Sequence, residues 1–248
     1  MKKILLFMAG VFASITTYSQ TIKTDSLKSL KPQAGNFSTE LNFNPFNGQL
    51  KLNNSLNQVK VRYFVNSSVA LRLGFNLSKK DSTSNFNNPY GVNSSFYNDS
   101  RHTTTYGVNF GFEKHLAGTR RLSPYIGADV YYAKKSSNQT IVNNQSTTTV
   151  SGGWLSYSYN GNATIQTVQE NGYSRYGVNL ISGFDFYIAP HFFFGYEFGF
   201  DLSKKNYDNV NVTVTGQGSG NNNNSNSTVS AFNFGTNLMN GIRLGYNF

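Results

Sequence analysis

Large apolar side chains alternate with small or polar ones along the end of the chain, from Ala231 to Phe248. Successive side chains of a β-strand point to opposite faces, so a period of two predicts a strand with two different faces. One face carries Phe232, Phe234, Leu238, Ile242, Leu244, Tyr246 and Phe248, and the other carries Asn233, Gly235, Asn237, Met239, Gly241, Arg243, Gly245 and Asn247. Such a strand fits a wall with lipid on one side and a hydrated interior on the other.

Seven further segments show the same alternation, each near the length of about 9–11 residues with which a tilted strand crosses a bilayer. They are Gly35–Asn44, Leu56–Val65, Val69–Ser78, Thr104–Lys114, Ser123–Ala133, Ser174–Ile188 and Phe192–Ser203. Short links (Asn66–Ser68, His115–Leu122, Ala189–His191) take turns with long polar links (Lys79–Thr103, Lys134–Tyr173, Lys204–Ser230). This arrangement is typical of membrane barrels. The sequence therefore predicts an all-β fold, a transmembrane antiparallel up-and-down β-barrel of eight strands.

A barrel of ten strands is the alternative, in which Gln139–Val150 and Trp154–Gln169 add another hairpin to the wall. Both stretches have Thr, Asn and Ser at positions where a lipid-facing strand needs apolar side chains. We therefore expect them to be strands that project beyond the membrane.

The N-terminus has the features of a secretory signal peptide. Met1–Lys3 is basic, Ile4–Ile15 is apolar but too short to span a bilayer as a helix, and Thr17–Ser19 offers small residues before a cleavage point. We expect a signal peptide over residues 1–19, a flexible periplasmic leader over 20–34 and a barrel domain over 35–248. The chain has no cysteine, which excludes disulfides and thiolate metal sites.

Aromatic residues make up 15% of the chain, as expected for a barrel with aromatic girdles at both membrane interfaces. The terminal Phe248, with Tyr246 before it, resembles the C-terminal signal that the barrel-assembly machinery recognises in outer-membrane barrels. From about Gly35 onward, the chain resembles the small eight-stranded outer-membrane barrels of the OmpX and OmpA-membrane-domain type. The resemblance implies the outer membrane of a Gram-negative bacterium, with periplasmic termini and extracellular long loops. It implies no particular activity, because this fold hosts several functions.

The inward face of the predicted barrel carries nearly balanced charges. The acids are Glu40, Glu113, Asp129, Asp185, Glu197 and Asp201, and the bases are Lys60, Arg62, Arg72, Arg175 and Arg243. Side chains can fill an eight-stranded barrel, and an unpaired charge in so narrow an interior is costly. We therefore expect an ionic network that plugs the lumen. A small porin-like channel is the alternative, although open aqueous channels need about 16–18 strands.

Three predicted strands end in lysine pairs on the long-loop side: Lys79 and Lys80, Lys134 and Lys135, and Lys204 and Lys205. Clustered lysines attract phosphate groups, so one interpretation is contact with lipopolysaccharide in the outer leaflet. The other is that lysines at a membrane boundary simply extend their charged ends into water. The net charge of +10 does not indicate nucleic-acid binding, because these lysines lie at the rim and the arginines in the lumen.

Ser100 and His102 share one face near a predicted strand end, with Asp81 and Asp99 nearby. Outer-membrane lipid A acylhydrolases use a serine and a histidine near the outer leaflet, which makes a lipid A-modifying enzyme an alternative function. The order here, Ser-x-His, is the reverse of that family's His-x-Ser, so a polar loop end is the favoured interpretation.

The other histidines, His115 and His191, are expected in periplasmic turns, and no cluster has metal-ligand spacing. We predict no catalytic residue, no metal and no cofactor. The expected protein is a monomeric, non-enzymatic surface protein whose long loops contact other molecules. Its expected partners are outer-membrane lipid and lipopolysaccharide, the barrel-assembly machinery and an unidentified surface ligand.

Overall fold

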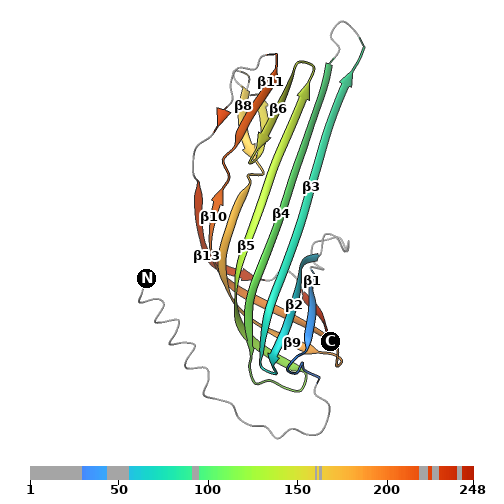
Figure 1. Ribbon diagram of the computed structural model, residues 1–248, viewed down its shortest axis with the longest axis vertical. Coiled ribbons are helices and arrows are strands. Elements are labelled where there is room, and N and C mark those ends of the chain that lie inside the picture. Colours follow the sequence, from blue (N-terminus) through green and yellow to red (C-terminus); the bar gives the residue numbers. More distant parts are fainter. Residues whose placement is uncertain are drawn as a thin grey trace.

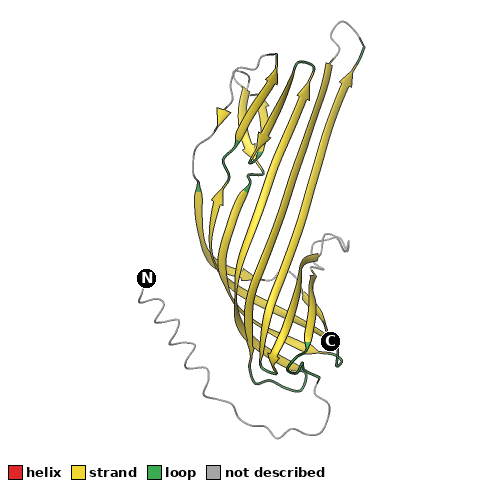
Figure 2. Ribbon diagram, in the orientation of Figure 1, coloured by secondary structure: helices red, strands yellow, loops and turns green. Residues whose placement is uncertain are grey.

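The computed structural model describes residues 30–43, 56–90, 95–159, 161, 164–217, 223–224, 229–238 and 242–248. Within these ranges the regular secondary structure consists of strands (Figures 1 and 2). The described part of the chain contains no helix that is long and apolar enough to cross a lipid bilayer. The predicted signal peptide and leader residues 20–29 lie outside the described residues.

The strands are β1 (Phe37–Phe43), β2 (Leu56–Asn66), β3 (Val69–Asn88), β4 (Ser95–His115), β5 (Leu122–Asn143), β6 (Ser146–Ser151), β7 (Trp154–Tyr159), β8 (Thr164–Gln169), β9 (Tyr173–Tyr187), β10 (Phe192–Tyr207), β11 (Asn211–Gly216), β12 (Asn223–Asn224), β13 (Ser230–Leu238) and β14 (Ile242–Asn247). Antiparallel pairing runs in the order β1-β2-β3-β4-β5-β9-β10, and β10 pairs with both β13 and β14. Because β14 also pairs with β1, the ring is closed.

The ring has eight positions, of which β13 and β14 together occupy the last. β13 pairs with Phe198–Asn206 of β10, and β14 pairs with Phe192–Gly195 of the same strand. The eight-stranded antiparallel barrel is therefore confirmed, and the ten-stranded alternative is wrong. Of the stretches that would have supplied two more wall strands, residues 139–143 extend β5, and β6, β7 and β8 lie outside the ring.

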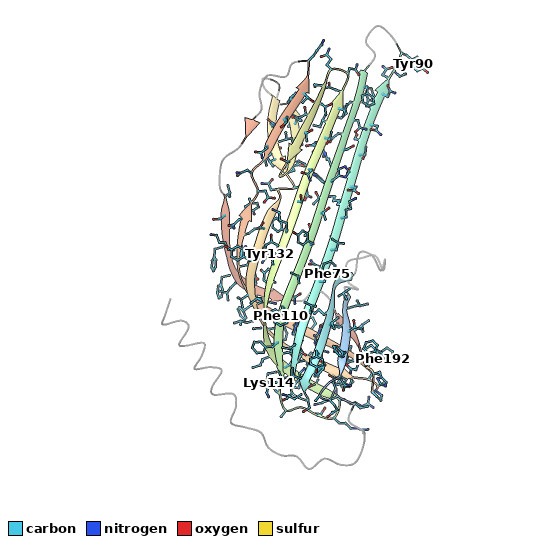
Figure 3. The ribbon with its side chains drawn as sticks, viewed as in Figure 1. Phe75, Tyr90, Phe110, Lys114, Tyr132 and Phe192 are labelled. Atoms are coloured by element: carbon cyan, nitrogen blue, oxygen red, sulfur yellow. The ribbon has the colours of Figure 1, made fainter. Side chains whose placement is uncertain are left out.

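The wall strands alternate between an exposed outer face and a buried inner face, as their period of two predicts. Rings such as Phe75, Phe110 and Tyr132 project outward from β3, β4 and β5 (Figure 3). Their sequence neighbours point inward, so Asn109 is buried next to the exposed Phe110. The outer surface of the ring is thus apolar and the inner surface is polar.

Three wall strands continue far beyond the ring. β3, β4 and β5 have 20, 21 and 22 residues, and the pairing of β3 with β4 runs out to Asn88 and Ser95 (Figure 1). The long link predicted over Lys79–Thr103 is therefore largely a β-hairpin, which corrects the expected loop. Both faces of the distal part of β3 meet solvent, and the residues that β4 buries there, Asp99 and Thr103, are polar, so no hydrophobic period marks the hairpin in the sequence.

The extended strands carry a second structural unit, here called the outer lobe: the distal parts of β3–β5 together with β6–β8 and β11. β6 pairs with β5, and β11 pairs with β6. The separate hairpin of β7 and β8 docks on β5 through Gln139, which accepts a hydrogen bond from Leu155 N at 2.7 Å and donates one to Leu155 O at 3.3 Å. The outer lobe buries four apolar side chains among the described residues: Ile141, Val150, Trp154 and Leu155.

The segment before β1 packs against the short-turn end of the barrel. Leu30 is buried in a cluster with Tyr187 and Phe193. Gly35 N donates to Phe64 O at 2.8 Å, and Gly35 adopts a left-handed backbone conformation with φ of 84°. The last residues of the predicted flexible leader are therefore in contact with the barrel.

Candidate functional site

Arg62, on β2, is the centre of an ion-pair network inside the barrel. Its Nη1 donates to Glu113 Oε1 and to Asp185 Oδ2, both at 2.7 Å. Its Nε donates to Ser38 Oγ at 3.2 Å and lies 3.7 Å from Glu40 Oε2. All five side chains are buried, so these charges are compensated by one another rather than by bulk water.

Arg243, on β14, contacts carboxylates of β1, β9 and β10. Its Nη1 donates to Glu40 Oε2 at 2.9 Å, and its Nη2 donates to Asp185 Oδ1 at 2.5 Å. Glu197 Oε2 lies 3.5 Å from Nη1. Because Asp185 also binds Arg62, one carboxylate links two guanidinium groups from strands on either side of β1.

Arg72, on β3 and directly paired with Arg62, adds further contacts to the network. It lies 3.1 Å from Glu113, 2.9 Å from Glu197 and 3.3 Å from Asp129. Lys60 donates to Glu197 Oε1 at 3.1 Å. Nine of the predicted lumen residues therefore form one connected set, in which every base contacts at least one acid.

The other two predicted lumen residues, Arg175 and Asp201, form an ion pair with each other. Asp201 also accepts hydrogen bonds from Tyr131 OH at 2.5 Å and from Ser203 Oγ at 2.8 Å. Among the described residues no ion pair joins this couple to the larger set. The inward charges are thus divided between a buried network and a half-buried pair nearer the outer lobe.

His115 belongs to the lumen, and its predicted place in a turn is wrong. It is the last residue of β4 and is buried, with Nε2 2.9 Å from Glu113 Oε1 and Nδ1 2.8 Å from Ser123 Oγ. The rings of Phe64 and Tyr125 lie about 5.5 Å away on either side. The strand's own alternation could have found it, since His115 has the same parity as Glu113.

Glu113, His115 and Asp185 bring their ligand atoms within 4.8 Å of one another, which is the spacing of a metal centre. Arg62 Nη1, however, lies 2.7 Å from both carboxylates. The guanidinium thus occupies the position where a cation would be bound, and a metal beside it would be repelled. These side chains fit the ion-pair network better than a metal site.

Four of the six lysines predicted at the barrel rim form ion pairs with carboxylates. Ion pairs join Lys79 to Asp81, Lys80 and Lys135 to Glu170, and Lys134 to Asp208. The hydrogen bond from Lys135 holds the pKa of the Glu170 carboxyl below its usual value. Lys205 lies over the rings of Tyr173 and Tyr207, while Lys204 is exposed.

Ser100 and His102 share the outer face of β4, but no hydrogen bond between them is present. His102 Nδ1 lies 2.8 Å from Asp81 Oδ1 on the paired strand, and this bond lowers the pKa of the Asp81 carboxyl. Ser100 Oγ donates instead to Asn98 Oδ1 at 2.9 Å. A serine nucleophile needs a base within hydrogen-bonding reach, and here the serine and the histidine have separate partners.

The predicted assembly signal lies where the ring closes. Phe248 N donates to Phe37 O at 2.8 Å, and Asn36 Nδ2 donates to Phe248 O at 2.9 Å. The Tyr246 ring stacks on His191 and meets the exposed Phe248 ring edge-on. Both aromatic side chains of the signal thus lie at the short-turn end of the outer surface.

No family model and no curated protein matches the chain. The chain is similar in structure to the N-terminal β-barrel domain of Pseudomonas aeruginosa OprF, with 12% identity over 88% of this chain and 100% of that one and a TM-score of 0.31. It is also similar to the outer membrane protein OprG of Pseudomonas aeruginosa, with 11% identity over 88% and 98% of the two chains and a TM-score of 0.41. The class of the protein, an eight-stranded β-barrel, rests on its own strand pairing.

Proposed function

We propose that this protein resides in the outer membrane of a Gram-negative bacterium, with its short turns in the periplasm and its outer lobe outside the cell. The exposed rings around the barrel, such as Phe75 and Phe110, form the apolar surface that lipid requires. The turn at residues 67–68 is short, whereas β3–β5 extend far beyond the ring at the opposite end. That asymmetry is typical of outer-membrane barrels.

The absence of cysteine allows a direct test of this orientation. Tyr90→Cys, at the distal end of the outer lobe (Figure 3), should react with a membrane-impermeant maleimide on intact cells. Leu116→Cys, in the turn after β4, should react only after the outer membrane is permeabilised. Labelling of Leu116→Cys on intact cells would contradict the orientation.

The same labelling tests the assembly signal. Deletion of Phe248 in the Tyr90→Cys chain should reduce surface labelling if the assembly machinery reads this residue.

The role that fits best is a structural and interaction role outside the cell, with a lumen closed by side chains and without catalysis. The observation that carries it is the buried network, in which Arg62, Arg72 and Arg243 each contact at least two carboxylates. A lumen filled in this way supports the barrel as a rigid scaffold for the outer lobe. Against the enzymatic alternative, lipid A mass spectrometry after expression should show no change that depends on His102.

Planar-bilayer recordings test the closed lumen. The purified protein should give no stable, uniform conductance steps, because paired charges occupy the interior of an eight-stranded ring. An open trimeric porin reconstituted in the same bilayers is the positive control. Uniform openings from the purified barrel would favour the channel alternative and contradict the plug.

Contact with lipopolysaccharide is proposed for the rim lysines whose charged ends are least engaged, above all Lys204. A Lys204→Gln, Lys205→Gln variant should retain less lipopolysaccharide through purification than the wild-type protein, because exposed lysines attract phosphate groups. Lys114→Gln, at the opposite end of the barrel, is the control for loss of a positive charge away from these lysines. Equal retention by all three proteins would assign these lysines to solvation alone.

A further inference from the structure

One face of the outer lobe gathers exposed aromatic rings. Phe86 on β3 and Tyr97 on β4 are directly paired and have the parity of the residues that point into the lumen farther down these strands. Their exposed fractions are 59% and 38%. Tyr157 of the docked hairpin is 52% exposed and lies close enough to interact electrostatically with the Tyr97 hydroxyl. Burial and the nearby Asp99 carboxylate raise the pKa of Tyr97, so this hydroxyl stays a hydrogen-bond donor.

Two cations lie on the same face, nearer the barrel than Phe86 and Tyr97, and gather around the buried Trp154. Lys80 Nζ is 5.4 Å and Arg101 Cζ is 5.7 Å from the centroid of the Trp154 ring, within the range of a cation–π contact. Asp99 Oδ2 fixes Arg101 by accepting from Nη2 at 2.7 Å and from Nε at 3.0 Å. Gln139 Nε2 holds the other oxygen of Asp99 at 2.9 Å. The cations are therefore positioned before any ligand arrives.

The charge on this face is unevenly exposed. The Asp99 side chain is 5% exposed, whereas its partner Arg101 is 31% exposed and Lys80 is 63% exposed. Glu170, 3.6 Å from Lys80, is shared with Lys135. The carboxylates thus lie beneath or to the side of the cationic groups, and the surface offered to a ligand is positive.

We propose that this face binds an acidic polysaccharide, with sugar rings against Phe86, Tyr97 and Tyr157 and sugar carboxylates at Lys80 and Arg101. The proposal rests on the extracellular placement of the outer lobe. A uronate unit combines an apolar ring face, a rim of hydroxyl groups and a negative charge, which matches aromatic rings, polar groups and cations on one surface. Because paired strands carry these groups, little conformational entropy is lost on binding.

The surroundings of the rings favour a saccharide over a protein partner. Ser82 and Ser84 lie between Lys80 and Phe86 on the same face of β3. On β5, Asn143 is paired with Tyr97 of β4. Hydroxyl and amide groups therefore flank the paired rings of Phe86 and Tyr97. The centre of a protein interface is instead a continuous, desolvated patch. These groups are suited to hydrogen bonding with sugar hydroxyls.

The test is a binding titration of the purified full-length protein in detergent with polygalacturonate, neutral dextran and polyphosphate. We expect binding of polygalacturonate that weakens with salt, and no binding of dextran. Lys80→Gln and the double variant Phe86→Ser, Tyr97→Ser should each weaken it by about five-fold or more, the usual threshold for an important interface side chain. Unchanged heat-modifiable migration would show that the variants are folded.

Alternation along the strands supplies matched controls. Lys79→Gln and Phe96→Ser remove the same groups from the opposite face of β3 and β4, and should leave the affinity unchanged. The proposal is overturned by failure of polygalacturonate to bind, by equal binding of dextran, by equal effects of Lys79→Gln and Lys80→Gln, or by tighter binding of polyphosphate that ignores the ring substitutions. Because the assay uses purified protein, such a failure is separable from a failure of the Tyr90→Cys labelling.

Discussion

Replacing Arg62 with methionine should lower the free energy of unfolding by about 3–5 kcal/mol, because loss of one partner leaves uncompensated charges in the interior. Arg62 Nη1 is 2.7 Å from both Glu113 and Asp185, and all three side chains are fully buried. The carboxylates would then face one another across the space that the guanidinium had filled. Urea unfolding in lipid vesicles, followed by heat-modifiable gel migration, measures the change.

Two comparisons separate this effect from ordinary loss of a side chain. Lys114→Met removes an exposed lysine that donates to Ser68 Oγ at 3.0 Å, and should change the free energy of unfolding by less than about 0.5 kcal/mol. Adding Asp185→Asn to Arg62→Met should recover part of the loss, since it removes one negative charge from a set in which acids then outnumber bases, while Arg243 keeps Glu40. If Arg62→Met behaves like Lys114→Met, the network does not stabilise the barrel.

The ring strands could be predicted because lipid and lumen impose opposite demands on alternate residues. The alternation over Gly35–Asn44 predicted a strand, and the structure has β1 at Phe37–Phe43. The same alternation predicted that Glu40 and Arg62 face the lumen, where both are buried. The distal part of β3 could not be recognised in this way. Solvent meets both of its faces, so polar residues stand at consecutive positions and the strand resembles a loop in sequence.

The membership of the network could also be predicted from parity, but its contacts could not. Arg62 and Asp185 are 123 residues apart and meet only because the ring closes. Which acid reaches which base depends on strand stagger, which a single strand's pattern does not contain. His115 was missed for a simpler reason: the strand runs one residue beyond its predicted end, and histidine itself gives no sign of which side of a strand end it occupies.

The docking of the β7–β8 hairpin is another feature that the sequence pattern could not predict. Trp154 is the only tryptophan in the chain, and it is buried between the hairpin and the sheet, where its Nε1 donates to His102 O at 3.4 Å. The stretch that contains it was expected to project beyond the membrane as a strand. The hairpin docks through a hydrogen bond to the side chain of Gln139 on β5, so the pattern of residues within the hairpin does not predict this docking.

Two glycines of the barrel should respond to alanine with opposite signs. Gly111 on β4 faces Asp129 on β5, and a Cβ at Gly111 would lie 2.1 Å from Asp129 Oδ1 and 2.2 Å from the backbone oxygen of Ala128. Gly235 on β13 has no atom within 4 Å of the same position. Close approach of a neighbouring side chain therefore requires glycine at residue 111 but not at residue 235.

Gly111→Ala should lower the free energy of unfolding by about 1–3 kcal/mol, the usual cost of overpacking an interior. Asp129 would have to move, and with it a carboxylate that lies 3.3 Å from Arg72 Nε in the network. Gly235→Ala should raise the free energy of unfolding by about 0.4–1 kcal/mol, because alanine restricts the unfolded chain without a steric conflict in the folded one. The same urea titration measures both variants. Equal effects at the two positions would show that Asp129 and the backbone of Ala128 can move to admit a methyl group at residue 111.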